Sequence, residues 1–278
     1  MPLRDYDTFI GVDLGGGKGK NTAVAVLERD GLVARAAFVG LRQSDGQPFY
    51  DDPLLAFIRQ RQGRAVLALD APLTLPACVR CHRESCPGRE QCPDLAVRWL
   101  RQGGPEAPRR VARVARVGAS KPSTTPYTQR ACELLLAREL GIVPRETLGQ
   151  GTGPLTARAY HLRRALAPHF ALDVNLIEVC PKATLHALFG ARQAERYKRH
   201  VDTWRVRAEM LEMLADRLRF EVWREGVLSN DHCFDALVAA YTAFLWAVEG
   251  WEVPADQRAL AQEDGWIWWP PGPSPSEG

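Results

Sequence analysis

Apolar residues in the first quarter of the chain fall into short uninterrupted runs, which is typical of buried strands. The first run ends in an acid, Asp13, and is followed by a glycine-rich segment. A helical pattern that begins at Asp52-Pro53 separates the third run from the fourth. This order predicts an antiparallel meander of three strands, a crossover helix and a fourth strand parallel to the first. The four predicted strands are residues 9–13, 21–27, 33–39 and 65–70.

Helical spacing dominates the rest of the chain, with one more apolar run before Pro181. The sequence therefore predicts an α/β protein with a mixed five-stranded sheet. We expect one domain over residues 1–278, with a cysteine-rich and basic insertion at 76–128 and a disordered tail at 271–278. The further predicted elements are helices 129–140, 156–167, 203–220 and 231–248 and strand 172–179.

Composition narrows the class of protein only a little. The apolar content of 46% and the charged content of 25% are those of a globular protein. The net charge of +3 is too small to indicate a nucleic-acid partner by itself. Neither a basic-then-apolar leader nor an apolar run of membrane-spanning length is present. We therefore expect a cytoplasmic protein without a membrane partner.

Acids stand at the ends of predicted strands or on the apolar face of the last helix: Asp13, Asp70, Glu178 and Asp235. Asp231 lies one helical turn before Asp235, so both can face the same way. Open α/β sheets bind ligands at the carboxyl ends of their parallel strands. Buried carboxylates persist together only if cations neutralise them or their pKa values rise. The pattern indicates a site for Mg²⁺ or Mn²⁺, although each acid alone could be a helix cap or an ion-pair member.

The sequence resembles a family of prokaryotic proteins that is catalogued as a domain of unknown function and described as predicted nucleases of the RNase H fold. The segments that carry the resemblance are GVDLGGGKGKNTAVAVL, LALDAPLTLP, IEVCPKATL, NDHCFDALVAAYTA and GWIWWP. The resemblance implies an RNase H-like sheet with helices on both faces. It also implies metal-binding acids at Asp13, Asp70 and Asp235. Asp231 is similar to the second acid of the helix pair in Holliday-junction resolvases, whereas Glu178 has no fixed counterpart.

Basic and polar residues near these acids are candidates for binding substrate phosphates. Lys18, Lys20 and Asn21 belong to the glycine-rich hairpin, and Lys182 follows the fifth predicted strand. Each lysine could equally be a solvated surface charge. Arg130 could point at a phosphate or form an i,i+3 ion pair on its own helix.

Four cysteines within fifteen residues predict a site with four sulfur ligands. The spacing C-x2-C-x4-C-x5-C is similar to that of a zinc knuckle, and the prolines after two of the cysteines also suit a [4Fe–4S] cluster. Zinc is favoured, in a role that staples the loop. The cysteines are Cys78, Cys81, Cys86 and Cys92.

A basic segment follows the cysteines and contains one acid, Glu106. Its glycines and prolines predict a mobile loop, which would either bind a nucleic-acid backbone or be solvated. Its basic residues are Arg98, Arg101, Arg109, Arg110, Arg113, Arg116 and Lys121.

The leading hypothesis is a divalent-metal-dependent nuclease of RNase H-like type. Two alternatives stay open: an actin-like ATP-dependent phosphotransferase, which also begins with a strand, an acid and a glycine hairpin, and a non-catalytic nucleic-acid-binding protein. The sequence leaves the choice of DNA or RNA and the oligomeric state open.

Overall fold

The computed structural model describes residues 4–18, 20–103, 124–222 and 224–272. Most of the basic segment, including Arg109, Arg110, Arg113, Arg116 and Lys121, lies outside the described residues, as does the predicted tail from residue 273. Arg98 and Arg101 are described, and they lie on a helix where the sequence predicted a loop.

A mixed sheet forms the centre of the molecule, with seven strands in the order β6-β3-β2-β1-β4-β5-β7 among the described residues. The first three strands form the predicted antiparallel meander, and β4 and β5 add in parallel beside β1. The prediction of five strands was wrong because two short parallel strands, β6 and β7, extend the sheet at its edges. The strands are β1 Thr8–Asp13, β2 Ala23–Asp30, β3 Val33–Gly40, β4 Ala65–Leu69, β5 Leu176–Val179, β6 Leu218–Phe220 and β7 Ile267–Trp268.

Helices connect the strands and cover the sheet. The predicted helix over 203–220 is shorter than expected, because α7 ends at Met213 and the chain turns into β6. The helices α6, α8 and α10 were not predicted. The α-helices of the described chain are α1 Asp51–Arg59, α2 Leu95–Gly103, α4 Ala131–Leu140, α5 Gly153–Leu166, α6 Pro181–Arg199, α7 Thr203–Met213, α8 Arg224–Ser229, α9 Asp231–Glu249 and α10 Arg258–Asp264.

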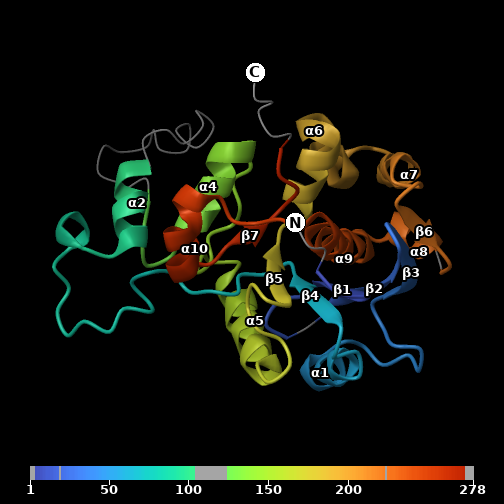
Figure 1. The fold of residues 1–278 in the computed structure, drawn as a ribbon, viewed down its shortest axis with the longest axis horizontal. Coiled ribbons are helices and arrows are strands. Elements are labelled where there is room, and N and C mark those ends of the chain that lie inside the picture. Colours follow the sequence, from blue (N-terminus) through green and yellow to red (C-terminus); the bar gives the residue numbers. More distant parts are fainter. Residues whose placement is uncertain (1–3, 19, 104–123, 223, 273–278) are drawn as a thin grey trace.

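Helices lie on both faces of the sheet (Figure 1). One face packs against α9, with α6, α7 and α8 beside it, and the other face packs against α1 and α5. Side chains alternate along each strand, so neighbouring residues of β1 enter different cores. Phe9 packs edge-on against Phe244 of α9, with ring centroids 5.5 Å apart, whereas Ile10 belongs to the core beneath α1 and α5.

The contact between β1 and α9 is unusually close because β1 carries a glycine there. A Cβ atom on Gly11 would lie 2.1 Å from the carbonyl oxygen of Ala236 and 2.2 Å from the backbone nitrogen of Ala240. The side chain of Asn230 caps α9 by accepting a hydrogen bond from the backbone N–H of Cys233 at 3.1 Å. The glycine thus fixes how near the first turns of α9 come to the end of β1.

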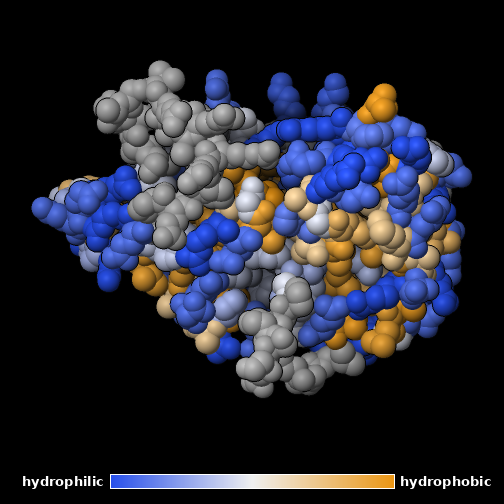
Figure 2. Space-filling model, turned by 90° about the horizontal axis from the view of Figure 1, so that it is seen from above, coloured by the Kyte–Doolittle hydropathy of each residue, from blue (hydrophilic) through white to orange (hydrophobic). Residues whose placement is uncertain are grey.

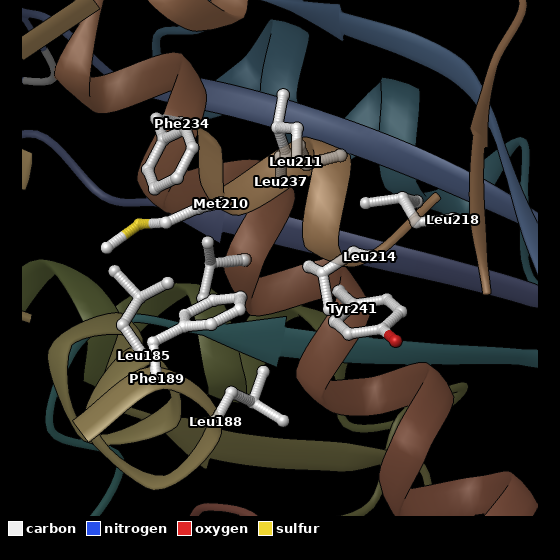
Figure 3. A pocket seen from close by; sticks show the side chains of 11 residues that line it. Leu185, Leu188, Phe189, Met210, Leu211, Leu214, Leu218, Phe234, Leu237 and Tyr241 are labelled. Carbon is white, nitrogen blue, oxygen red and sulfur yellow. The ribbon is translucent and has the colours of Figure 1, made fainter. Parts of the chain in front are cut away.

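A small apolar gap lies in the core between α6, α7, α9 and β6 (Figure 3). Its volume is about 10 Å³, and side chains such as Leu185, Met210 and Phe234 line it. A gap of this size and polarity holds a single water molecule at most, so it belongs to the packed core.

The face of the molecule that carries α6 is largely polar (Figure 2). Figure 2 shows the face that carries α6, where hydrophilic residues predominate and hydrophobic residues are visible in patches between them. Within the described ranges, no helix has both the length and the apolar character needed to cross a bilayer.

Candidate active site

A cleft of about 710 Å³ lies at the carboxyl ends of β1, β4 and β5. The glycine hairpin between β1 and β2 contributes to its wall, as do the start of α9 and both ends of α6. The cleft therefore occupies the position at which parallel strands of α/β proteins bind ligands.

Three carboxylates from distant parts of the sequence meet in this cleft: Asp13, Asp70 and Asp235. Asp13 ends β1 and Asp70 directly follows β4, and the Asp70 N–H donates to the Val12 carbonyl at 2.9 Å. Asp235 precedes Ala236, the residue whose carbonyl oxygen lies against Gly11. The close crossing of β1 by α9 therefore carries Asp235 to the two strand ends.

Burial and mutual repulsion disfavour the charged forms of the carboxylates in this cluster. Burial raises the pKa of Asp70 well above its ordinary value, and the charges of Asp13 and Asp235 raise it further. Burial likewise raises the pKa of Asp235 to about 6. Asp235 is only 1% exposed. The Tyr197 side chain lies close enough to lower the pKa of Asp235, but by hydrogen-bond geometry the Oδ1 atom has no partner among the described residues.

Two basic side chains that the sequence did not single out touch the cluster. The Lys198 Nζ atom, near the end of α6, donates to Asp235 Oδ2, and His232 Nδ1 donates to Asp13 Oδ2 at 2.7 Å. The hydrogen bond to Asp13 raises the pKa of His232. Burial lowers the pKa of Lys198, but the charge and hydrogen bond of Asp235 together with the charges of Asp13 and Asp70 outweigh burial, so the net shift is upward.

His232 was open to prediction, because it lies three residues before Asp235 on the same helix. Lys198 lies far from every motif in the sequence, so nothing in the pattern pointed to it.

Glu178 lines the same cleft but is engaged elsewhere. It pairs in register with Leu69, so its side chain leaves the sheet on the face opposite to that of Asp13 and Asp70. Its carboxylate accepts two hydrogen bonds from Arg130, at 2.8 Å and 2.5 Å, and one from the Leu73 N–H at 2.8 Å. The charge of Glu178 is therefore balanced by an arginine within the fold.

Arg130 is buried and serves as the centre of a polar network behind the cleft. Besides Glu178 it contacts Glu133, through the i,i+3 ion pair at 3.2 Å that the sequence allowed, and Thr147 at 2.7 Å. Burial raises the pKa of Glu133 to about 7. With its guanidinium bonded to these partners, Arg130 stabilises the wall of the cleft.

Asp264 at the end of α10 ties this wall to the cysteine loop. Its carboxylate accepts hydrogen bonds from the first backbone N–H groups of α4, those of Ala131 and Cys132, and so caps that helix. It also accepts a hydrogen bond from Arg80, which lies between the first two cysteines of the loop, at 3.2 Å.

A family model described as "Protein of unknown function (DUF429)" matches residues 11–259, most of the chain. The protein belongs to this family. The matched range begins at the β1 glycine and contains all three carboxylates of the cluster. Comparisons with curated proteins and with solved structures gave no match.

The glycine hairpin of this DUF429 protein is held by an arginine that the sequence analysis missed. Arg158 on α5 donates to the Gly15 carbonyl at 2.8 Å and to Thr22 Oγ1 at 2.7 Å, and pairs with Asp51 at 2.6 Å. A Cβ atom on Gly15 would lie 2.2 Å from the Lys20 carbonyl oxygen, which explains the glycine.

The predicted phosphate-binding residues have different surroundings. Lys20 and Asn21 line the cleft, and Asn21 adopts a left-handed φ of 68°. Lys18 is exposed on the same hairpin. Lys182 lines the cleft and pairs with Glu195 at 2.6 Å. Asp231 lines the cleft at the first position of α9.

The four loop cysteines of the DUF429 chain are close enough to influence one another. Burial raises the pKa of Cys78, and the thiols of the other three raise it further. Cys78, Cys81 and Cys86 are exposed and Cys92 is partly buried, all as free thiols. Across the described part of the chain, no three or more His, Cys, Asp or Glu side chains are arranged as a metal site. Zinc or an iron–sulfur cluster at these cysteines therefore stays a prediction.

The acid cluster suits a hard divalent cation in its chemistry. Its donors are carboxylate oxygens, which Mg²⁺ and Mn²⁺ prefer, and the buried Asp235 Oδ1 lacks a partner among the described residues. In the arrangement described, however, Lys198 and His232 engage Asp235 and Asp13 in place of a metal ion. The donor atoms therefore suit a divalent cation, but among the described residues the three carboxylates are not arranged as a metal site, and two protein cations are bonded to them.

Proposed function

We propose that this protein is a divalent-metal-dependent nuclease that hydrolyses phosphodiester bonds at the cluster of Asp13, Asp70 and Asp235. The observation that carries the proposal is the state of Asp235, a fully buried carboxylate that keeps one oxygen without a partner among the described residues. A buried charge in this state is costly unless a cation completes its surroundings. The charge of Asp13 increases that need, and Asp70 lies close enough to interact with Asp235 as well.

The arrangement of the central strands supports an RNase H-like type. The order β3-β2-β1-β4-β5 is a meander followed by two parallel strands, as the sequence resemblance implies. The acids at the ends of β1 and β4 and on a late helix occupy the corresponding elements.

In this proposal Asp13, Asp70 and Asp235 hold Mg²⁺ or Mn²⁺. When bound, such ions lower the pKa of the attacking water and neutralise the leaving oxygen. Lys20 and Lys182 line the same cleft and bind the phosphates that flank the scissile bond. His232 orients Asp13 through its hydrogen bond. Nucleic acid is thus the proposed partner, with DNA and RNA both to be tried.

Cleavage of labelled DNA and RNA, each single-stranded, duplex and branched, tests the proposal in buffers with Mg²⁺, Mn²⁺ or EDTA. We expect turnover that requires the metal and falls at least roughly a hundredfold in Asp13→Asn, Asp70→Asn and Asp235→Asn, as when transition-state charge stabilisation is lost. Asp256→Asn is the control, because Asp256 is an exposed acid of the 3₁₀ turn Ala255–Gln257, outside the cleft.

Equal turnover in wild type and Asp13→Asn, after careful purification, would sink the proposal. Salt-sensitive binding of nucleic acid without turnover would instead favour the non-catalytic alternative.

A further inference from the structure

Lys198 occupies the position at which the acid cluster needs positive charge. Its ammonium group donates to Asp235 Oδ2, and Asp13 and Asp70 add to the attraction it feels. Among the described residues, Lys198 and His232 are the cationic side chains bonded to the three carboxylates. Because His232 bonds to Asp13, Lys198 alone of the two engages Asp235.

The ion pair with Lys198 supplies a hydrogen bond to only one of the two carboxylate oxygens of Asp235. One carboxylate oxygen bonds to Lys198, and the other is buried in the cleft wall without a partner in the described chain. A divalent ion could use both oxygens, but the ammonium group lies against one of them. The two cations therefore compete for the same ligand, and each excludes the other by charge repulsion.

The helix that carries Lys198 is broken near its middle. At Gly190, α6 leaves helical geometry, with φ 81° and ψ 165°, so Ala191 and the residues that follow form a separate helical segment. Positive φ favours glycine at such a break, and a Cβ atom at this position would meet nothing within 4 Å. Lys182 and Glu195 pair across the break at 2.6 Å, with both side chains partly exposed.

We propose that Lys198 is the resident counter-ion of the acid cluster and competes directly with divalent metal for Asp235, so that this residue sets the metal affinity of the site. The inference rests on the proposed function only in that a divalent ion binds the cluster. In the metal-free protein the ammonium group limits repulsion among the carboxylates. When metal binds, the partly exposed Lys198 side chain turns away from Asp235 into the cleft, while Ala194 and Tyr197 hold this half of α6 in the core.

Binding of Mn²⁺ to the full chain, measured from the electron paramagnetic resonance signal of free Mn²⁺, tests the inference without any nuclease assay. Lys198→Met removes the competing charge at similar side-chain length. We expect it to bind Mn²⁺ at least tenfold more tightly than wild type, which corresponds to about 1.4 kcal/mol. Lys198→Arg keeps the charge and is expected to bind no more tightly than wild type.

Two controls locate the effect. Arg192→Met removes an exposed basic side chain on the same half of α6 that does not line the cleft, so its Mn²⁺ affinity is expected to stay within about twofold of wild type. Adding Asp235→Asn to Lys198→Met is expected to abolish the gain, because the contested ligand is then gone.

Lys198→Gln guards against misfolding, because it keeps a hydrogen-bond donor for Asp235 without the charge. Mn²⁺ binding that is unchanged or weaker in both Lys198→Met and Lys198→Gln would overturn the inference. Tighter Mn²⁺ binding in a protein that cleaves no nucleic acid would remove the proposed function and leave the inference standing.

Discussion

Replacing Gly11 with alanine perturbs the contact on which the acid cluster depends. The new Cβ atom would lie 2.1 Å from the Ala236 carbonyl oxygen and 2.2 Å from the Ala240 nitrogen. Non-bonded carbon contacts are comfortable at about 3.5 Å or more, so α9 would have to move from β1 by roughly 1 Å or more. The clash involves the backbone of a buried helix, so no side chain can rotate away to relieve it.

The expected cost can be estimated from what such overpacking does elsewhere. Extra carbon atoms in a packed core typically cost about 1–3 kcal/mol, and a clash with rigid backbone belongs at the upper end of that range. Replacing glycine also lowers the conformational entropy of the unfolded chain, which offsets about 0.4–1 kcal/mol of this cost. We therefore expect Gly11→Ala to lower the free energy of unfolding by about 2 kcal/mol or more.

Urea unfolding followed by tryptophan fluorescence measures this loss. With a slope of about 3 kcal/mol per molar urea, the midpoint is expected to fall by roughly 0.7 M. Gly16→Ala is the matched control, because a Cβ atom at Gly16 meets nothing within 4 Å. Its stability is expected to stay within about 0.5 kcal/mol of wild type. If Gly11→Ala and Gly16→Ala unfold at the same urea concentration, the β1–α9 crossing does not depend on this glycine.

Three further predictions follow from the buried network and the cysteine loop. Arg130→Met leaves Glu178 buried without its partner and is expected to cost about 3–5 kcal/mol of stability in urea unfolding. Arg138→Met breaks an exposed ion pair on α4 and is expected to cost at most about 1 kcal/mol. Similar losses in the two variants would contradict a stabilising role for the Arg130 network. Burial raises the pKa of Glu133 from 4.5 to about 7, so its contribution to stability is present below pH 4.5 and is lost as pH rises through 7. Urea unfolding across this pH range is expected to show a steeper loss of stability in wild type than in Glu133→Gln. Parallel curves of stability against pH would refute the raised pKa of Glu133. Elemental analysis of the purified protein is expected to find about one tightly bound zinc per chain, which Cys78→Ser loses. A visible absorption band would indicate an iron–sulfur cluster instead. A metal-free protein would contradict a metal site at the four cysteines.

The meander, the parallel fourth strand and α9 could be predicted because their apolar patterns are long and uniform. The edge strands could not, since β6 has three residues and β7 has two, too few for an alternation to be visible. The same limit explains the wrong end of α7, because the chain from Met213 onward keeps apolar residues that serve a strand. The structure of these short segments is determined by their pairing with neighbouring strands in the folded sheet.

The sequence also placed Glu178 with the acids although its partner lies far away in the chain. Strand alternation was available as a signal: Glu178 lies an even number of residues from Leu176, which enters the core beneath α5, so the two share a face. What no local pattern could supply is the pairing with Arg130, 48 positions earlier. Lys198 was missed for the same reason, since only the folded chain brings it to Asp235.

The part of the chain that secures the cleft wall is synthesised after the acids of the cleft. Asp264 holds the start of α4, and β7 covers the open edge of β5, the strand that carries Glu178. During translation, β5 therefore emerges from the ribosome long before its neighbour exists, and it presents unpaired backbone groups in the meantime. A nascent chain that stalls before Arg258 would carry the acids without their support, and it would be a target for chaperones and proteases.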